Sequence, residues 1–437
     1  MYFNDTQIIE RMESFFDRLW PINRSITGPG MRKSLDIIGE IFPTTRLKFN
    51  TGTRAFDWIV PPEWDVTDAY FIDPLNKKHA EFKKNNLHLI GYSAPMKKKV
   101  SLSELKKHIY TLPNLPNAIP YVTSYYNDNW GFCISHEELE QLPEGEYEVM
   151  IDTKFYNGHV EIGEAILPGN SKKEVLFSTY LCHPSMASNE LSGPLVMAFL
   201  YECIKKIPNR RYTYRFVITS ETIGTICYLS ERGLHLKDNL IAGYVMTCLG
   251  DNGDFTYVVS RKENTLADRA AKIVLRDLGK HTILPFNPGD TGSDERQYCS
   301  PGFDLPVGSL MRTMYRLYPE YHTSLDNKDF ICFKSMADSV KTYLKIAIAL
   351  ENNYYWNNTV KYCEPQLGRR GLYHDISFNT QETWQDRSAA MLWLLNLAEG
   401  RNDLLAIAEK SGHKIELLIK IISDLKNAGL LEKSNNE

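Results

Sequence analysis

The chain contains 437 residues, of which 43% are hydrophobic and 24% are charged. This is the composition of a folded globular protein, and it excludes the collagen-like, coiled-coil and disordered classes. With 50 basic and 54 acidic residues the formal charge is −4, so the chain as a whole does not attract nucleic acid or anionic lipid. At roughly 100–200 residues per domain, the length predicts about two to four domains.

The N-terminal segment 1–20 carries no pattern of a secretory signal, because acidic and basic residues interrupt its apolar residues. No apolar run approaches the roughly 18 residues that a membrane-spanning helix needs. The eight cysteines stand singly, without a C-x-x-C pair, and several lie in apolar, strand-like runs. We therefore expect reduced, mostly buried thiols in a cytoplasmic protein without a membrane segment.

Residues 6–43 show the pattern of a helix, a loop and a second helix. Apolar residues recur at helical spacing in TQIIERMESFFDRLW, behind a capping signal at Thr6, and again in MRKSLDIIGEIF after the turn-rich PINRSITGPG. From 51 to 157 the segments become short, aromatic and β-branched, and Pro, Gly and Asn separate them. This range is predicted to be a separate, inserted β-rich domain.

After Pro168-Gly169 the sequence alternates between strand and helix patterns. The predicted strands are EVLFSTYLC, YRFVITS and LIAGYVMTCLG, and the helices between them are GPLVMAFLYECIKKI and IGTICYLSERG. Such alternation predicts parallel βαβ units, and hence an α/β fold with helices on both faces of a mixed or parallel sheet. A long helical pattern at 334–355 closes the fold. We predict one discontinuous α/β domain made of 1–50 and 158–360.

Residues 378–437 are predicted to form a winged helix-turn-helix, because three helical patterns precede a short strand pattern. A DNA-binding unit of this kind normally has a basic face. Residues 384–437 contain seven Lys or Arg against eight Asp or Glu, and the expected recognition helix, 414–427, is largely Leu and Ile. We therefore expect this unit to contact protein, either a second copy or a partner, rather than nucleic acid.

Three polar side chains of the α/β domain lie directly after predicted strands or in a loop before a predicted helix. His183 comes directly after EVLFSTYLC, Glu221 leaves the apolar strand YRFVITS, and His322 lies in a loop before the closing helix. Because α/β domains bind ligands at the carboxyl ends of parallel strands, we expect these side chains to meet there. The alternatives are a histidine hydrogen-bonded within a loop and a glutamate that caps the next helix.

The order of these motifs resembles the di-zinc aminopeptidase family, which also includes glutaminyl cyclases. The shared pattern is a histidine after a strand, Ser-Gly at a helix start, Glu-x-x-Gly after a strand, Gly-Ser-Asp ahead of a Gly-x-x-x-Pro strand, and His-Thr-x-x-Asp. In this sequence the matching residues are His183, Ser192-Gly193, Glu221 with Gly224, Gly292-Ser293-Asp294 with Gly302 and Pro306, and His322 with Asp326.

Longer sequence segments resemble those of a narrower family, the bacterial polysaccharide-biosynthesis proteins with an aminopeptidase-like domain. They include WPINRSITGPGMR, FDWIVPPEW, STYLCHPSMASNELSGP and GSDERQYCSPGFDLPV, and the resemblance covers nearly the whole chain. It implies a zinc-peptidase-like α/β domain, an inserted β domain and a C-terminal winged helix.

The sequence departs from the aminopeptidase family at the metal ligands. That family uses a histidine, a bridging aspartate, a glutamate, a second aspartate and a final histidine, with a glutamate base beside the glutamate ligand. Carried over by position, the bridging aspartate falls on Asn189, the glutamate ligand on Thr222 and the second aspartate near Thr247. A neutral Asn oxygen is a poor zinc ligand and cannot bridge two dications. We therefore expect one zinc ion rather than two.

Two imidazoles and one carboxylate are the protein ligands of a catalytic mononuclear zinc. We assign them to His183, His322 and Glu190, with Asn189 as a further candidate ligand and Glu221 as the general base. The alternative is that Glu221 is itself a ligand. The expected function is a zinc-dependent, aminopeptidase-like hydrolase of amide or peptide bonds, linked to surface polysaccharide biosynthesis. An N-deacylase of an amino sugar and a degenerate, non-catalytic binding module stay open as alternatives.

Four polar residues near the expected mouth of the site are candidates for binding a carboxylate, sugar or amine of the substrate. They are Asp294, Arg296, Arg312 and Tyr321. The alternative for each is an ordinary position at the solvated surface.

The inserted domain is rich in aromatic residues. Examples are Trp58, Trp64, Tyr125, Tyr126 and Trp130. Aromatic rings can bind sugars, but they also fill small β cores, and the core interpretation is favoured.

Overall fold

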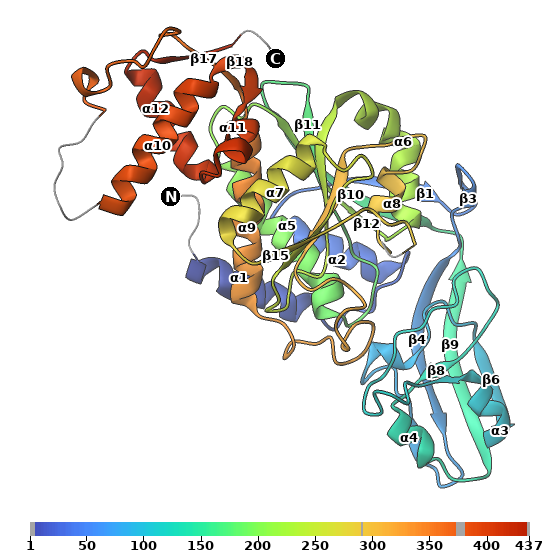
Figure 1. The fold of residues 1–437 in the computed structure, drawn as a ribbon. Helices are drawn as coiled ribbons and strands as arrows, with labels where there is room; N and C mark the ends of the chain where they lie inside the picture. The colour runs from blue at the N-terminus through green and yellow to red at the C-terminus, as the bar shows by residue number, and fades with distance from the viewer. Residues whose placement is uncertain (1–4, 290–291, 373–380, 435–437) are drawn as a thin grey trace.

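The computed structural model describes residues 5–289, 292–372 and 381–434. Figure 1 shows three parts in a row, with an α/β domain in the middle, the inserted domain at one end and the C-terminal unit, drawn in red, at the other. An eight-stranded mixed sheet runs through the middle part. The predicted α/β class is confirmed.

The sheet of the α/β domain has parallel strands at its centre and antiparallel strands beside them. Its members are β1 (Thr45–Asn50), β10 (His159–Leu167), β11 (Glu174–Tyr180), β12 (Thr213–Thr219), β13 (Leu240–Met246), β14 (Phe255–Val258), β15 (His281–Leu284) and β16 (Val307–Met311). The order is β1-β10-β12-β11-β13-β16-β14-β15, and β12, β11, β13 and β16 are mutually parallel. Because both faces of these strands are covered, their sequences are almost continuously apolar.

Helices cover both faces of this sheet. One face carries α1 (Asp5–Leu19), α2 (Pro29–Gly39), α5 (Ser192–Lys205), α7 (Leu266–Leu278) and α9 (Phe333–Glu351). The other face carries α6 (Ile223–Asn239) and the short α8 (Glu295–Tyr298). The predicted helices near the N-terminus, after the first two strands and at the end of the domain are thereby confirmed.

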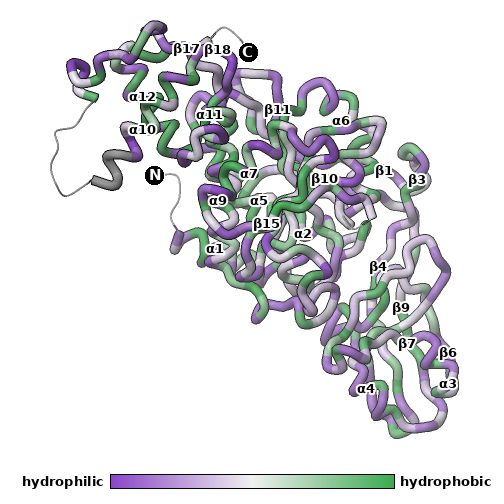
Figure 2. The backbone as a smooth tube through the Cα atoms, in the orientation of Figure 1, coloured by the Kyte–Doolittle hydropathy of each residue, from purple (hydrophilic) through white to green (hydrophobic). Residues whose placement is uncertain are grey.

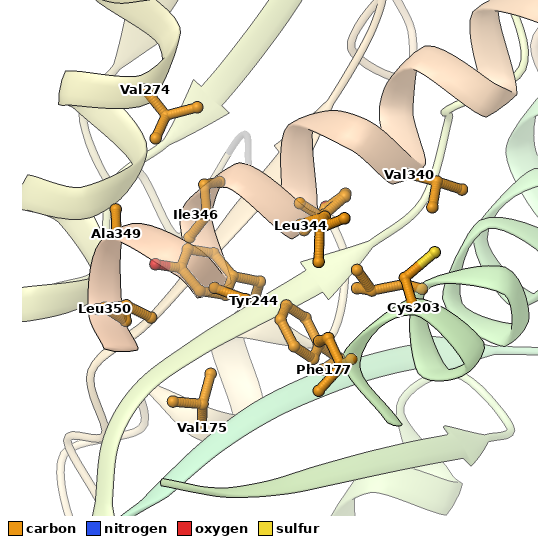
Figure 3. Close-up of a cluster of buried hydrophobic side chains, with 14 of the residues drawn as sticks. Val175, Phe177, Cys203, Tyr244, Val274, Val340, Leu344, Ile346, Ala349 and Leu350 are labelled. Carbon is orange, nitrogen blue, oxygen red and sulfur yellow. The ribbon is translucent and has the colours of Figure 1, made fainter. Parts of the chain in front are cut away.

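The main core lies between the central strands and α9. Figure 3 shows Phe177 of β11 and Tyr244 of β13 near Leu344 and Ile346 of α9, and all four side chains are buried. Burying a side chain of this size contributes about 1.5–3 kcal/mol. Figure 2 shows hydrophobic residues along the central strands and hydrophilic residues in many of the outer loops. The loops at the strand ends are therefore attached to a well-packed core.

The inserted domain has a sheet and a core of its own. Its elements are β2 (Arg54–Ala55), β3 (Trp58–Ile59), β4 (Glu63–Ile72), β5 (Lys78–His79), β6 (Met96–Ser101), α3 (Leu102–Leu105), β7 (Ile109–Tyr110), β8 (Phe132–Cys133), α4 (His136–Glu140) and β9 (Glu146–Tyr156). The strand order of its main sheet is β5-β4-β9-β6. Trp64 and Trp130 are buried in this core, as the core interpretation predicted for them. The chain leaves the α/β domain after β1 and returns to it at β10, which are neighbouring strands.

Glu63 links the inserted domain to the α/β domain where the chain crosses between them. Its carboxylate accepts hydrogen bonds from Arg32 of α2 (2.7 and 3.0 Å), from Tyr156 Oη (2.9 Å) and from the main-chain N–H of His159 (3.0 Å). Burial disfavours the charged carboxylate, but these donors outweigh burial and hold the pKa of Glu63 below its usual range.

The substitution Glu63→Gln is expected to lower the free energy of unfolding by about 1–3 kcal/mol at neutral pH, because Arg32 loses its buried charged partner. Since the folded pKa is lowered, this stabilisation is present above the unfolded pKa of about 4.3 and is lost as pH falls through the folded value. Urea unfolding at neutral pH and near pH 3 measures the effect. The control is Glu146→Gln, at an exposed position. If the free energies of unfolding of Glu63→Gln and wild type differed by the same amount at both pH values, this role of Glu63 would be contradicted.

The C-terminal unit is a winged helix. It contains β17 (Tyr355–Asn358), α10 (Gln381–Leu397), β18 (Glu399–Asp403), α11 (Leu404–Ser411), α12 (Ile415–Asn427) and β19 (Leu431–Lys433). The strand β17 pairs with both β18 and β19, so this unit begins before the predicted boundary at 378. The sequence-based division left 355–358 in the α/β domain because a short strand at the end of a long helical pattern carries little signal. Residues 378–380 and 435–437 of the predicted unit lie outside the described residues.

The winged helix packs on α7 and α9 of the α/β domain. Asp403 forms a two-bonded ion pair with Arg269 of α7 (2.6 and 2.8 Å), and Asp277 accepts the N–H of Ile415 at the start of α12 (2.7 Å). The first turn of α12, the part of a recognition helix that would enter a DNA groove, therefore contacts the α/β domain.

Within the described ranges, none of the helices has the length and apolar character needed to cross a membrane.

Candidate active site

Three loops at the carboxyl end of the central strands bring the predicted side chains together. His183 follows β11, Glu221 follows β12, and His322 lies in the loop between β16 and α9. Ser185, Thr222 and His322 in these loops have positive φ angles of 42°, 64° and 56°. Non-glycine residues with such strained backbone gather at functional sites. The three loops that the sequence pattern selected thus lie together at one edge of the sheet.

His183 is oriented by Glu190, which lies in the turn Ala187–Leu191. Oε2 of Glu190 lies 2.7 Å from Nδ1 of His183, and Oε1 accepts the main-chain N–H of His183 at 2.9 Å. Nε2 of His183 is thereby left as the nitrogen that can meet a ligand. A carboxylate behind a metal-binding histidine has this geometry. Glu190 was predicted as a direct metal ligand; in the structure both of its oxygens bind His183, which gives it an orienting role.

Arg24 supports this pair from the loop between α1 and α2, and sequence reasoning did not select it. Its buried guanidinium donates from Nε to the carbonyl of His183 (3.0 Å) and from Nη1 to the carbonyl of Leu19 (2.7 Å), with Nε 3.9 Å from Oε1 of Glu190. Burial lowers the pKa of Arg24 to about 10, while Glu190 acts in the opposite direction. Arg24 therefore remains charged at neutral pH and offsets the buried charge of Glu190.

Glu221 presents its carboxylate to the exposed side of His183. Its Oε2 lies 3.7 Å from Nε2 of His183. Asp294 holds the Glu221 loop from behind by accepting the N–H of Thr222 (2.8 Å). Desolvation raises the pKa of Glu221 to about 8, with His183 opposing this shift and Asp294 adding to it. Glu221 can therefore take up and release a proton near neutral pH.

His322 supplies the second imidazole, and the inserted domain holds it in place. Its ring centroid lies 5.3 Å from that of His183, and Tyr321 stacks on it at 3.9 Å. Tyr121 of the inserted domain contacts both imidazoles, with centroid distances of 5.1 Å, and its N–H donates to the carbonyl of His322 (2.8 Å). Tyr121 was missed in the sequence because it is about 200 residues from His322 along the chain and carries no motif.

The two imidazoles differ in charge. Burial opposes a charge on His183, but Cys182 and Glu190 outweigh burial and raise the pKa of His183 well above its usual range. Burial and the neighbouring His183 lower the pKa of His322 well below its usual range. These opposite shifts favour a proton on His183 over one on His322, so a metal ion that binds Nε2 of His183 competes with that proton.

Where a bridging carboxylate would be needed for a second metal, the structure has the amide of Asn189, and the nearby carboxylate of Asp326 is engaged by main-chain N–H groups. Nδ2 of Asn189 donates to Tyr180 Oη (3.1 Å), and Thr247 Oγ1 donates to the main-chain carbonyl of Asn189 (2.9 Å). Asp326 accepts the main-chain N–H groups of Ser188 and Asn189 (2.6 and 2.9 Å), so it shapes the turn. Oδ1 of Asn189 is buried and has no hydrogen-bond partner among the described residues.

The donors that are present fit one divalent ion. Nε2 of His183 and the ring of His322 are ligand types of a mononuclear catalytic site, and the carboxylate of Glu221 lies beside them, where it can act as the base. A second group of donor atoms, from Cys182, His183 and Glu190, lies within 4.8 Å of one another. In that group Nδ1 of His183 already shares a hydrogen bond with Glu190, and burial raises the pKa of Cys182 to about 11, which keeps the thiol protonated. The Nε2 side is therefore the better fit.

The four predicted substrate-binding residues separate into one at the site and three that support the fold. Tyr321 lies at the site, stacked on an imidazole. Asp294 is buried behind the loop after β12, and Arg296 donates to main-chain carbonyls (3.4 and 3.5 Å). Arg312 donates to one hydroxyl and two carbonyls, and its guanidinium covers the ring of Phe255. Only Tyr321 is placed to contact a substrate.

A cavity of about 250 Å³ opens onto His183 and Glu221. Trp58, Tyr125 and Tyr126 of the inserted domain form part of its lining. The other lining residues are Ile26, Cys182, Thr222 and Ile223. Apart from His183 and Glu221, the lining residues are uncharged, so the cavity suits a neutral group next to a reacting centre.

The fold of the chain is that of the zinc-dependent aminopeptidases. The zinc aminopeptidase of Bacillus subtilis aligns with a TM-score of 0.57 and 11% identity over 80% of this chain and 95% of that one. A peptidase M28 precursor of Shewanella amazonensis aligns with a TM-score of 0.53 and 12% identity over 80% of this chain and 98% of that one. At these identities the likeness concerns the fold alone.

The chain belongs to the family described as a domain of unknown function, DUF4910, which it matches over residues 13–353; residues 354–433 match a winged helix-turn-helix family. A Clostridium acetobutylicum protein is 41% identical over 410 residues, 94% of this chain and 93% of that protein. It is named, provisionally, as a polysaccharide biosynthesis protein with an aminopeptidase-like domain, so the expected resemblance is confirmed. A crystal structure from the same organism, provisionally described as a peptidase, aligns with a TM-score of 0.91 at 39% identity over 99% of this chain and 98% of that one.

Proposed function

We propose that this chain hydrolyses amide or peptide bonds with the help of one bound divalent metal ion, and that this ion is zinc. The observation that carries the proposal is the position of Glu221, 3.7 Å from a nitrogen of His183 whose other nitrogen is fixed by Glu190, with His322 alongside. The aminopeptidase-like fold supports the reaction class. The name of the Clostridium acetobutylicum relative supports a link to polysaccharide biosynthesis.

Separate residues of the site would bind the metal ion, transfer the proton and hold the imidazole in position. His183 and His322 would hold the ion, and Oδ1 of Asn189, a buried acceptor without a partner among the described residues, is the remaining candidate donor. A bound ion would supply Lewis-acid chemistry by polarising the carbonyl of the scissile amide. Glu221 takes a proton from water as the water oxygen attacks the carbonyl carbon, and then passes that proton to the leaving amine. Tyr321 and Tyr121 keep the ring of His322 in place.

Removal of metal tests this proposal. Treatment with a chelator is expected to abolish amide hydrolysis, and about one equivalent of zinc per chain is expected to restore it, because the donors suit one ion. The substrates are aminoacyl, peptidyl and N-acyl amino-sugar compounds. Hydrolysis that persists in the chelated protein would contradict the metal requirement. Zinc binding without turnover of any substrate would favour the alternative of a binding module, which the loss of carboxylates at Asn189, Thr222 and Thr247 motivates.

We also propose that the winged helix serves protein contacts rather than DNA binding, and that the chain works in the cytoplasm. Supporting the first proposal, the start of α12 is capped by Asp277 of α7. Supporting the second, none of the eight cysteines, all of which lie in the described residues, forms a disulfide bond, and six of them are buried.

A further inference from the structure

Two of the aromatic residues that line the cavity, Trp58 and Tyr126, belong to the inserted domain but lie outside its core. Trp58 lies on the β2–β3 hairpin, which touches the α/β domain through a ring contact between Phe56 and Phe303 (5.7 Å). Trp58 and Tyr126 meet edge to face at 5.9 Å and are 39% and 54% exposed, whereas Trp64 in the core is 3% exposed. The core interpretation of these aromatics is therefore wrong for Trp58 and Tyr126. Their rings remain available to a ligand.

Trp58 also lines a second hollow, of about 550 Å³, on the surface of α6 and α8. The polar side chains there are mainly hydroxyls and an amide, from Ser230, Ser300 and Gln297. Asp57 carries the only charge among the lining residues of this hollow, and neither hollow is lined by Lys or Arg. Apart from the imidazole of His183, a phosphate or carboxylate would find no basic side chain among the lining residues of either hollow, whereas the hydroxyl groups of a neutral ligand would find matching partners.

We propose that the inserted domain forms a sugar-binding subsite, in which the ring of a neutral amino-sugar unit lies against Trp58 and Tyr126 and the rest of the glycan extends into the second hollow. The C–H face of a sugar ring packs on an aromatic ring, and its hydroxyls bond to uncharged polar side chains. The cavity of about 250 Å³ is smaller than a typical drug-sized pocket, which suits a single ring.

The subsite also indicates which amide is cleaved. An N-acylated amino sugar carries an amide directly on its neutral ring, so a ring held by Trp58 brings that amide towards His183 and Glu221, which line the same cavity. This step rests on the proposed function, whereas sugar binding itself does not. An apolar amino-acid side chain is the rival occupant. Such a side chain would match the apolar lining residues of the second hollow, among them Ile226, Leu229 and Leu234, but it would leave the hydroxyl and amide side chains there without partners.

Calorimetric titration of the metal-free, full-length protein with N-acetylglucosamine oligosaccharides tests the subsite without any need for activity. We expect saturable binding, and we expect Trp58→Ala to weaken it at least about tenfold through the loss of ring stacking. Trp58→Phe keeps an aromatic face and is expected to retain most of the affinity. Trp393→Ala is the matched control, because Trp393 is 41% exposed but lies on α10 of the winged helix.

The outcomes separate the two proposals. Absence of binding at millimolar oligosaccharide, binding that Trp58→Ala leaves unchanged, or tighter binding of neutral hydrophobic tripeptides than of oligosaccharides would each overturn the sugar subsite. If oligosaccharides bind in a Trp58-dependent way but the zinc-loaded protein hydrolyses no amide, the proposed function fails and the sugar subsite stands.

Discussion

Replacing Glu221 with glutamine is expected to lower kcat for amide hydrolysis by about 100- to 10,000-fold, which is the usual contribution of a general base. Glutamine has nearly the same size and shape, but it cannot take a proton from water. The walls of the cavity stay in place, so KM is expected to change little. Steady-state kinetics with the best substrate of the panel, at constant zinc, measures both constants.

A second glutamate on the next helix provides a matched control for this experiment. Glu231 of α6 is 44% exposed and pairs with Arg232, so Glu231→Gln is expected to retain full activity. If Glu221→Gln retains kcat within about threefold, Glu221 is not the base. A loss of bound zinc in Glu221→Gln would instead assign Glu221 as a metal ligand.

Replacing Arg24 with methionine is expected to lower the free energy of unfolding by about 3–5 kcal/mol, because the buried carboxylate of Glu190 loses its nearby positive charge. The methionine side chain fills much of the space but donates no hydrogen bond to the carbonyls of His183 and Leu19. Thermal or urea unfolding of the metal-free protein measures the loss. We also expect weaker zinc binding, since the orientation of His183 depends on Glu190.

The exposed Arg18 provides the control for Arg24. Arg18 of α1 forms a two-bonded ion pair with Glu40 at the surface, and its removal is expected to change stability by less than about 1 kcal/mol. The double variant Arg24→Met, Glu190→Gln removes both buried charges, so it is expected to be less destabilised than the sum of the single variants. Additive losses, or a loss for Arg24→Met no larger than that for Arg18→Met, would show that Arg24 does not stabilise Glu190.

The elements of the α/β domain could be predicted because their patterns are strong and local. EVLFSTY and YRFVIT are mostly apolar and are buried along their length, as is typical of central parallel strands, and the long helix that ends at Glu351 has an unbroken period. The strand Tyr355–Asn358 could not be predicted in its proper unit. Its partners lie more than 40 residues further along the chain, and pairing at such distance leaves no local pattern.

The site could be predicted in part, for a similar reason. His183 and Glu221 directly follow strands, so the rule for strand ends brings them together. The orienting role of Glu190 depends on which atoms its two oxygens meet, and only the folded turn determines that. Tyr121 and Trp58 reach the site from another domain, and no spacing in the sequence records such a contact.

Anomalous diffraction at the zinc edge, from crystals grown with zinc, tests the central claim most directly. We expect one peak per chain, bonded to Nε2 of His183 and to His322, with Glu190 still hydrogen-bonded to Nδ1 of His183. In crystals of His322→Ala, grown in the same way, this peak should be lost or strongly weakened. Two strong peaks, a peak on the Nδ1 side among Cys182, His183 and Glu190, or no peak at all would contradict the single-metal site proposed here.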